Sequence, residues 1–401
     1  MPITDQKQIK DILERGVEKI YPDPEKLSEL LKSGTKLKIY CGFDPSAKSL
    51  HIGNAVLINK LAQFQALGHE VIFLIGDFTG MIGDPTDKQA VRKTLTRKEA
   101  KENSKNYKAQ ASKFLQFSGS NKAKLMYNSK WQDKLNFKDL IELASHFTVQ
   151  QMIQRDMFQE RLKTEKPIYL HEFLYPLAQG YDSVVLDVDL EIGGNDQMFN
   201  MMAGRNLMKQ TNKKEKFVLT LKLLVDGDGN KMGKTTGNAL FLDIDAQNMY
   251  GIIMSWPDDV IALGFELCTK VPFDKVKEIK KQLADPNINP RDLKMKLALE
   301  ITKIVHGEDK ANQAREHFVS TVQNKEIPDK IPEIIVGEGT IILDAAVKYF
   351  ANKRSNGEIR RLFTGGGVTI NNHKIDDFKH KVKDQDIVKI GKRDWFKVKT
   401  S

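Results

Sequence analysis

The sequence predicts an α/β protein with a parallel-sheet domain, followed by an all-helical domain and a small α+β domain. An apolar run over 37–43, a helical pattern over 52–67 and a continuous apolar run over 70–75 form a strand–helix–strand unit. Such units build parallel sheets with right-handed crossovers. Residues 240–322 carry helical apolar spacing, and the segment after 340 combines helical stretches with a small sheet.

Length and composition limit the kind of protein. A chain of 401 residues is too long for one ordinary core and predicts roughly two or three domains. Its apolar runs are shorter than the ~20 residues of a membrane helix, and its N-terminus lacks a charged-then-apolar signal pattern. Cys41 and Cys268 lie far apart and cannot form a disulfide framework. We therefore expect a soluble cytoplasmic protein that does not enter a membrane.

The net charge of +10 is concentrated near the C-terminus. Residues 341–401 contain 14 Lys and Arg against 7 Asp and Glu, a surplus of 7. A solvated basic surface is the commonest reason for such a surplus. Its concentration in one segment nevertheless favours contact with a nucleic acid.

A first candidate site lies between the first predicted strand of the sheet and the helix after it. The turn Asp44-Pro45-Ser46 follows the strand, and His51-Ile52-Gly53-Asn54 begins the helix. A helix start presents unpaired N–H groups and the positive end of the helix dipole, which suit a polyphosphate. His51 and Asn54 add donors, and Gly53 lets a flat ring approach the backbone. Helix capping by His51 is the plainer alternative.

A second candidate site is Lys231-Met232-Gly233-Lys234-Thr235, which follows a glycine-rich loop. Two lysines on such a loop form a cationic lid that can close on triphosphate oxygens. In this order, the two motifs resemble the His-Ile-Gly-His and Lys-Met-Ser-Lys-Ser signatures of class I aminoacyl-tRNA synthetases. Asn54 replaces the second histidine and keeps a donor, whereas Gly233 and Thr235 replace the serines.

Further polar residues follow the second strand of the unit. The glycine-rich loop after it carries Asp84, with Lys88 and Arg92 just beyond. Because ligands gather where parallel strands end, this loop should face the same crevice as His51. The plainer roles are a turn residue for Asp84 and a solvated pair for the two cations.

Most other segments of the first domain are predicted to be helical. Residues 4–32 form a cover, 94–118 a mostly solvent-facing helix, and 137–163 further helices, while an apolar run over 184–188 predicts another strand.

A polar set lies just before that run. Tyr175, Gln179 and Asp182 are spaced by four and three, so they share one helix face. A phenol, an amide and a carboxylate on one face predict the lining of a pocket, with a solvent-facing surface as the alternative. After the run, Gly193-Gly194-Asn195-Asp196-Gln197 lets the backbone approach a ligand, and Asp196 suits a ribose hydroxyl pair.

Together these segments resemble the tyrosyl-tRNA synthetase family over nearly the whole chain. The matching segments are Tyr40 to Ser46, Ile82 to Pro85, Tyr175 to Asp182, Gly193 to Gln197 and Lys231 to Thr235. The resemblance implies a Rossmann-like catalytic domain of the bacterial type. It also implies ATP and L-tyrosine as substrates, tRNA(Tyr) as partner, and a homodimer.

The resemblance also implies roles for matching positions. The tyrosine contacts would be Tyr40 and Asp182 for the phenol, Asp84, Tyr175 and Gln179 for the ammonium group, and Gln197 near the carboxylate. The ATP contacts would be Cys41 and Asp196 for the ribose, Ser46, His51, Lys88, Arg92, Lys231, Lys234 and Thr235 for the phosphates, and Gly53 and Asn54 in the first motif.

The implied chemistry fits these residue types. A tyrosine carboxylate is already ionised at neutral pH, so its attack on the α-phosphate needs positioning and positive charge and no general base. We expect His51, Lys231, Lys234 and Thr235 to be catalytic. Magnesium would be held mainly by the ATP phosphates, and no metal cage of protein side chains is expected. A buried Asp182 lacking the substrate hydroxyl would be unpaired, which predicts rejection of phenylalanine.

Four regions are predicted along the chain. They are a catalytic domain over 1–239, an all-helical domain over 240–322, a proline-containing linker over 323–338 and an RNA-binding domain over 339–401. The resemblance implies that the all-helical domain is the anticodon-side domain. The last resembles an RNA-binding module of a small-subunit ribosomal protein, which grips folded RNA by shape and phosphate. Its candidate RNA contacts are Arg360, Arg361 and Lys374.

Two other interpretations stay open at this point. In a non-catalytic RNA-binding paralogue, Asn54 and Gly233 would no longer support adenylate formation. The many pocket residues that remain argue against it. A tryptophan-specific ligase or another adenylyltransferase would share the fold, but Tyr40 with Asp182 disfavours both.

Overall fold

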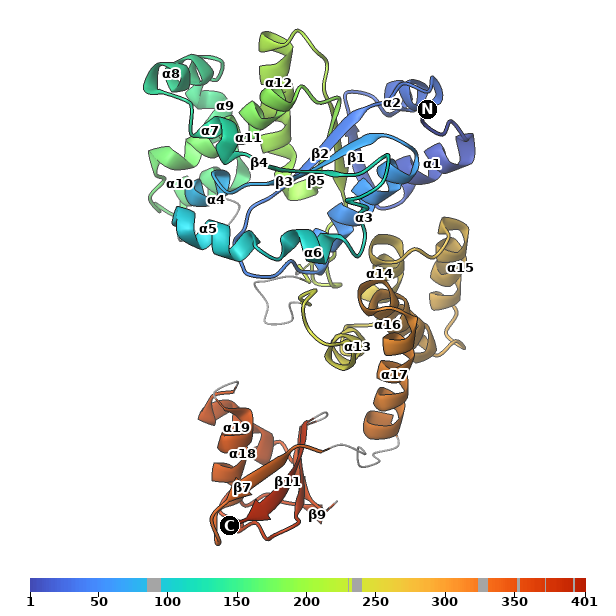
Figure 1. Cartoon of the computed structure of the whole chain (residues 1–401), viewed down its shortest axis with the longest axis vertical. Coiled ribbons are helices and arrows are strands. Elements are labelled where there is room, and N and C mark those ends of the chain that lie inside the picture. Colours follow the sequence, from blue (N-terminus) through green and yellow to red (C-terminus); the bar gives the residue numbers. More distant parts are fainter. Residues whose placement is uncertain are drawn as a thin grey trace. The chain divides into compact units, whose positions relative to one another are not determined.

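The protein is described here by a computed structural model (Figure 1). The structure describes residues 1–84, 95–229, 231–232, 240–323, 331–351, 354–371, 373–391 and 394–401. The chain forms two compact units, Met1–Glu308 and Asp309–Ser401.

A six-stranded sheet is the centre of the first unit, in the order β1-β6-β5-β2-β3-β4. The strands are β1 (Val17–Tyr21), β2 (Lys38–Phe43), β3 (Glu70–Ile75), β4 (Lys124–Tyr127), β5 (Leu190–Gly194) and β6 (Phe217–Leu221). Strands β6, β5, β2, β3 and β4 pair in parallel, and β1 pairs antiparallel with β6 at the edge. The predicted parallel α/β fold is therefore confirmed.

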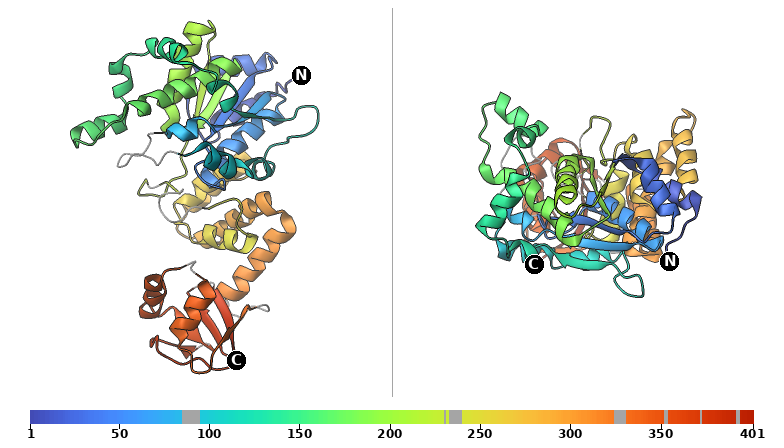
Figure 2. Two further views of the ribbon diagram at one scale, coloured as in Figure 1. Left: turned by 60° about the vertical axis from the view of Figure 1, so that its left-hand side comes forward. Right: turned by 90° about the horizontal axis from the view of Figure 1, so that it is seen from above.

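Most helices of the first unit accompany this sheet. Those described in the first unit are α1 (Gln6–Glu14), α2 (Pro24–Lys32), α3 (Ile52–Ala66), α4 (Thr79–Ile82), α5 (Arg97–Ser104), α6 (Tyr107–Ala111), α7 (Ser129–Gln132), α8 (Phe137–Ser145), α9 (Val149–Ile153), α10 (Asp156–Lys163), α11 (Leu170–Leu186), α12 (Met198–Thr211), α13 (Ala246–Met254), α14 (Val260–Cys268), α15 (Phe273–Leu283) and α16 (Pro290–His306). The last four of these helices pack together and meet the rest mainly where α14 contacts α3. Figure 2 shows α8 to α10 at the side of the unit opposite α1 and α2.

The two faces of the sheet pack against different helices. Tyr40 of β2 belongs to a buried cluster with Leu186 of α11 and Met208 of α12. Side chains alternate along a strand, so the neighbouring Cys41 points to the opposite face. Helix α3 packs against β2, β3 and β5 and covers that face. Tyr40 and Cys41, although neighbours on β2, therefore lie on opposite faces of the sheet. Tyr40 faces α11 and α12, and Cys41 faces α3.

Three details of the sequence prediction are wrong. Residues 184–186 are the last turn of α11, and the strand begins only at Leu190. The apolar run there packs a helix end against the sheet, which periodicity over so few residues cannot distinguish from a strand. Strand β1 lies within the predicted helical cover over 4–32. The predicted helix over 94–118 is interrupted, and Tyr107 and Leu115 within it are buried.

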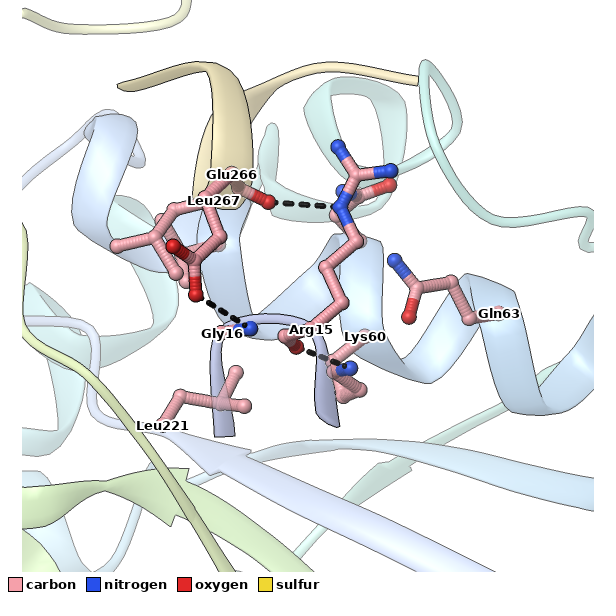
Figure 3. Close-up of a pocket in the computed structure, with 9 residues that line it drawn as sticks. Arg15, Gly16, Lys60, Gln63, Leu221, Glu266 and Leu267 are labelled. Atoms are coloured by element: carbon pink, nitrogen blue, oxygen red, sulfur yellow. Dashed lines mark hydrogen bonds between the residues drawn. The ribbon is translucent and has the colours of Figure 1, made fainter. Parts of the chain in front are cut away.

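A buried junction joins α1, α3 and α14 (Figure 3). The Arg15 guanidinium donates to backbone carbonyls at the end of α14, those of Phe265, Glu266, Thr269 and Val271. On α3, Lys60 Nζ donates to the carbonyls of Ile12 and Arg15, at 2.7 and 2.8 Å. Cations at helix C-termini are favourable, although burial lowers the pKa of Lys60 to about 7. The small pocket at this junction is therefore structural.

The second unit is a small α+β fold. Its sheet has the order β7-β11-β10-β8-β9. Its elements are α17 (Glu308–Phe318, beginning at the boundary), a π-helical turn (Val319–Gln323), β7 (Glu333–Val336), α18 (Ile342–Phe350), α19 (Asn356–Thr364), β8 (Val368–Ile370), β9 (His373–Lys374), β10 (Ile387–Ile390) and β11 (Asp394–Thr400). Phe350, Phe363 and Phe396 belong to its buried core.

Strand β7 lies within the predicted linker over 323–338 and pairs in parallel with β11. The linker prediction is therefore wrong at its C-terminal end. Two prolines in this segment favoured a linker, although its last residues form a short edge strand. The other predicted domain boundaries remain predictions. No helix in the described part of the chain is long and apolar enough to cross a membrane.

Candidate active site

The candidate site lies where three neighbouring parallel strands end. Strands β2, β3 and β5 are adjacent, so their carboxyl ends share one edge of the sheet. Asp44 follows β2, Gly76 follows β3, and the 3-10 turn Asn195–Gln197 follows β5. A Cβ on Gly76 would lie 2.0 Å from Asp44 Oδ1, so only glycine allows this approach. These loops therefore share one edge of the sheet, and the expectation that the loop after β3 faces the same crevice as His51 stays a prediction.

Asp182 is buried on α11 and accepts hydrogen bonds from α7 and its N-terminal flank. Its Oδ1 accepts hydrogen bonds from Trp131 Nε1 at 2.7 Å and Gln132 Nε2 at 2.8 Å, and its Oδ2 accepts one from Asn128 Nδ2 at 3.1 Å. Burial raises the pKa of Asp182 to about 7, although these three donors oppose the shift.

The prediction that Asp182 would be unpaired without a substrate hydroxyl is wrong. A carboxylate oxygen accepts about two hydrogen bonds. Among the described residues, Oδ1 of Asp182 already receives two donors and Oδ2 receives one. One acceptor direction on Oδ2 therefore remains for a ligand hydroxyl.

A hydrogen-bonded chain connects Asp182 to Tyr175. Asn128 Nδ2 also lies 3.0 Å from Thr79 Oγ1, which donates to Asp44 Oδ1 at 2.6 Å. Tyr175 Oη donates to Asp44 Oδ2 at 2.8 Å. Two predicted tyrosine contacts, expected at opposite ends of the substrate, are thus held by one network.

A second network connects Tyr40 to Gln179. Tyr40 Oη lies 2.8 Å from Ser183 Oγ, and Ser183 Oγ lies 3.4 Å from Glu191 Oε2. Gln179 Nε2 donates to Glu191 Oε1 at 2.9 Å. Lys216 forms a buried ion pair with Glu191. Burial raises the pKa of Tyr40 well above its usual value, and the nearby Glu191 and Asp182 carboxylates add to the shift.

Asp84 is a third buried anchor. Its Oδ2 accepts a hydrogen bond from Gln197 Nε2 at 2.6 Å. Its Oδ1 lies 3.3 Å from Arg155 Nη2 and 3.4 Å from Asn200 Nδ2. The structure therefore brings Asp84 and Gln197 together. The Arg155 guanidinium compensates the negative charge of the Asp84 carboxylate.

The first motif begins α3 as expected. His51 Nδ1 accepts a hydrogen bond from the Gly53 N–H at 3.1 Å, and Asn54 Oδ1 accepts one from the His51 N–H at 3.0 Å. The capping role of His51 is therefore real, and it also fixes the ring. Since Nδ1 accepts, a neutral His51 carries its proton on Nε2.

The segment that follows the second motif pairs with the first motif. Leu240, in that segment, accepts from the Ile52 N–H at 2.8 Å, and the Leu242 N–H donates to the Leu50 carbonyl at 2.9 Å. Lys231 Nζ lies 2.7 Å from Asp196 Oδ2, in an ion pair whose side chains are 49% and 31% exposed. A lysine of the second motif and the predicted ribose carboxylate are therefore neighbours.

The remaining predicted residues divide into two groups. Cys41 is buried on β2, and the Ser46 N–H donates to the Asp44 carbonyl at 2.8 Å in the turn after that strand. Lys88, Arg92, Lys234 and Thr235 lie outside the described residues, as does Gly233.

Sequence reasoning missed several residues that build the site. They are Asp44, Thr79, Asn128, Trp131, Gln132, Arg155, Ser183, Glu191, Asn200 and Lys216. The signals available were the Asp-Pro turn for Asp44 and the helical spacing of Ser183 beside Asp182. Arg155 and Lys216 come from unremarkable segments that only the fold brings near.

Comparison with known proteins agrees with this geometry. Residues 32–323 match the family described as tRNA synthetases class I (W and Y), so the chain is a class I tRNA synthetase. A tyrosine–tRNA ligase of Thermotoga maritima is 40% identical over 399 residues, covering 99% of this chain and 98% of the relative. Tyrosine–tRNA ligase 2 of Clostridium acetobutylicum is 42% identical over 392 residues, covering 96% and 97%.

Solved structures show the same fold. A truncated mitochondrial tyrosyl-tRNA synthetase of Coccidioides posadasii has a TM-score of 0.63 at 25% identity, covering 77% of this chain and 91% of that one. A tyrosyl-tRNA synthetase of Archaeoglobus fulgidus, solved with L-tyrosine, has a TM-score of 0.61 at 20% identity, covering 78% and 100%.

Within class I, the chain therefore belongs to the tyrosine–tRNA ligase family. The expectation of an aminoacyl-tRNA ligase that joins tyrosine to tRNA is confirmed, as is the use of ATP as substrate. The tryptophan-specific alternative is not supported, because these curated relatives are tyrosine ligases.

Proposed function

We propose that L-tyrosine binds between the two buried networks, with its phenol at Tyr40 and Asp182. The remaining acceptor direction on Asp182 Oδ2 suits a phenol O–H. The ammonium group would be held by Asp84, Tyr175 and Gln179, which supply a carboxylate, a phenol oxygen and an amide oxygen. Gln197, already hydrogen-bonded to Asp84, would lie near the tyrosine carboxylate.

ATP would bind across the two motifs. The N–H groups at the start of α3, His51 Nε2, Lys231, Lys234 and Thr235 would surround its phosphates, together with Ser46, Lys88 and Arg92. Lys231 is paired with Asp196, so its transfer to the phosphates would release the Asp196 carboxylate for the ribose hydroxyls. Cys41 would serve the ribose, and Gly53 and Asn54 would support the nucleotide beside His51.

In the first step, a tyrosine carboxylate oxygen forms a bond to the α-phosphorus of ATP. The bond from that phosphorus to the bridging oxygen breaks, and pyrophosphate leaves. The cations and donors of the two motifs stabilise the negative charge that grows on these oxygens. In the second step, a hydroxyl of the terminal tRNA adenosine attacks the adenylate carbonyl, and AMP leaves as tyrosine is transferred.

Magnesium would arrive bound to the ATP phosphates. Among the described residues, no group of three or more His, Cys, Asp or Glu side chains is placed to hold a metal ion. Such side chains would be needed for a site made by the protein alone. The metal would neutralise phosphate charge, while the protein residues orient the two substrates.

The C-terminal unit would bind tRNA(Tyr). Arg360 and Arg361 are exposed on α19, and Lys374 is exposed on β9. The Lys374 stem passes beside Gly366, just after α19, where a Cβ would lie 2.5 Å from Lys374 Cε. The three cations thus belong to neighbouring elements.

Replacing Arg360 and Arg361 by alanine should raise the KM for tRNA. It should also reduce the slope of log K for tRNA binding against log salt concentration by about one per cation removed. Unchanged tRNA binding would contradict this role.

A homodimer, working in the cytoplasm, would form through α8 to α11. Large apolar side chains are exposed along these helices, with Phe137 at 77% and Leu170 at 83% exposure. Ile141 and Val149 add to this surface, and such apolar surfaces typically mark protein interfaces. Sedimentation should show Phe137→Asp shifting the protein to monomer, while Ile335→Asp, at an exposed site in the second unit, should not. If both variants had the same oligomeric state, the proposal that the homodimer forms through α8 to α11 would be contradicted.

The observation that carries the proposal is the buried Asp182 with one acceptor direction left beside Tyr40. The test is exchange of labelled pyrophosphate into ATP with tyrosine, phenylalanine or tryptophan. We expect exchange with tyrosine, its loss in Asp182→Ala and Lys234→Ala, and its retention in Lys209→Ala, an exposed lysine on α12. No exchange in a folded protein would overturn the proposal.

A further inference from the structure

A buried ion pair lies beneath the proposed tyrosine site and has no role in the steps above. Lys216 of the segment before β6 and Glu191 of β5 contact each other with side chains that are 0% and 3% exposed. Lys216 Nζ also donates to Ser183 Oγ at 2.9 Å. Burying two charges is costly and often contributes little net stability. The pair therefore calls for an explanation other than stability.

The pair touches both sides of the proposed tyrosine site. Through Glu191 it reaches Gln179, and through Ser183 it reaches Tyr40, at 2.9 and 2.8 Å respectively. These two residues are the proposed contacts of the ammonium group and the phenol. No other ion pair among the described residues contacts both Gln179 and Ser183.

Glu191 determines which way the Gln179 amide faces. An ionised carboxylate only accepts hydrogen bonds, so the Gln179 NH₂ group must be the part that faces it. The Gln179 carbonyl oxygen is then directed away from Glu191. An ammonium group needs an acceptor, so this orientation is the one that binds it.

Lys216 Nζ contacts the Glu191 carboxylate and compensates its charge. Burial lowers the pKa of Lys216, and the adjacent carboxylate opposes the shift. Lys216 also donates to Ser183 Oγ and thereby fixes the oxygen against which the Tyr40 hydroxyl packs.

The packing of α11 on α12 provides the space for this ammonium. Gly204 of α12 lies beside it, and a Cβ there would lie 2.7 Å from Lys216 Nζ and 3.0 Å from Ser183 Oγ. The same Cβ would lie 3.2 Å from Gly180 Cα on α11. Glycines on both helices thus leave room for Lys216 where the helices cross.

We propose that Glu191 and Lys216 are positioning residues that orient Gln179 and Tyr40 for tyrosine. This inference rests on the proposed function, because it takes these two residues as substrate contacts. The pair acts through them and touches neither ATP nor the reacting phosphate. Its loss should therefore weaken tyrosine binding selectively.

The test replaces the pair by uncharged residues of similar size, Glu191→Gln with Lys216→Met. Changing both avoids leaving one buried charge unpaired. We expect the KM for tyrosine in pyrophosphate exchange to rise about tenfold, the order of a hydrogen bond to a charged group. The KM for ATP should stay within about twofold, because the hydrogen bonds described for the pair reach Gln179 and Ser183 and no residue of the two motifs.

The control is an equally buried ion pair of the same unit. Arg161 of α10 and Glu172 of α11 lie 2.6 Å apart with side chains 2% and 3% exposed. Arg161→Met with Glu172→Gln should leave the KM for tyrosine unchanged. An equal rise in both double variants would show a merely structural effect and overturn the inference.

Gln179→Ala separates the two proposals. If it leaves tyrosine binding unchanged, the proposed substrate contact fails. If it weakens tyrosine binding and the Glu191/Lys216 variant does not, only the inference fails.

If the Glu191/Lys216 variant does not fold, Ser183→Ala provides the alternative test, because it removes the link to Tyr40 without changing charge. It should raise the KM for tyrosine about threefold, and an unchanged KM would overturn the inference.

Discussion

The proposed amino-acid end and the proposed phosphate end of the site are built differently. At the amino-acid end, Asp182, Tyr40 and Asp84 are buried and held by hydrogen bonds from several elements. At the phosphate end, His51 is held within its own helix start, and Lys231 pairs with Asp196 while half exposed. Under the proposed function, the tyrosine contacts are already held in place by the protein, whereas Lys231 would exchange Asp196 for a phosphate when ATP binds.

This difference has a physical reason. Selecting tyrosine requires polar groups in fixed positions, since a misplaced buried donor or acceptor costs as much as a lost hydrogen bond. Stabilising a departing pyrophosphate requires charge that acts mainly in the transition state. A buried network suits the first task, and an exposed cation that changes partner suits the second.

The largest expected effect is at the phosphate end. Lys231→Ala should lower the rate of tyrosyl-adenylate formation by about 10²–10³-fold, since it removes a donor to developing charge. The KM for tyrosine should change little. Stopped-flow or quenched-flow measurement of the first turnover checks both, with Lys209→Ala as the matched surface control. A loss confined to tyrosine binding would reverse the assignment of the two ends.

The next effect is at the amino-acid end. Asp182→Asn keeps the shape but replaces one acceptor oxygen by an NH₂ group. We expect kcat/KM for tyrosine to fall about 10–100-fold, with a much smaller change for phenylalanine, which lacks the hydroxyl. Parallel exchange assays with the two amino acids measure this. An equal loss for both would mean that Asp182 acts on the fold and not on the phenol.

A pH dependence follows from the raised pKa of Asp182, about 7. The ionised carboxylate accepts the phenol O–H, and protonation removes that acceptor. Tyrosine binding should therefore weaken as the pH falls through 7, by about tenfold one unit below it. Titrating tyrosine at pH 6 to 8 tests this, and Asp182→Asn should flatten the profile. A profile unchanged by that substitution would assign the titration to another group.

The smallest expected effect is that of salt. Raising the salt from about 0.05 to 0.5 M shortens the screening length several-fold and weakens exposed charge interactions most. The KM for ATP should rise about threefold, while the KM for tyrosine stays within about twofold. Exchange assays at fixed magnesium measure both values. Equal sensitivity of the two would show that both ends are similarly exposed.

The sequence predicted those parts of the molecule that are local in the chain. The helix carrying Tyr175, Gln179 and Asp182 follows from spacing alone, and the parallel sheet follows from the strand–helix–strand pattern. The first motif likewise lies at a helix start, with His51 as its cap.

The parts that failed depend on packing between distant segments. The apolar run at 184–188 is compatible with a strand and with a helix end. In the fold, its first three residues form the last turn of α11. Edge strands such as β7 are too short for periodicity to reveal. Asn128 and Lys216 reach their partners from 54 and 25 residues away, so nothing local marks them.

Equilibrium binding of tyrosine without ATP tests most directly whether the two ends are separate. Calorimetry would compare the unmodified chain with Gln179→Ala and Lys231→Ala. We expect Gln179→Ala to raise the Kd for tyrosine about tenfold and Lys231→Ala to leave it within about twofold. An equal loss of tyrosine binding in Lys231→Ala would contradict a tyrosine pocket formed independently of the phosphate end.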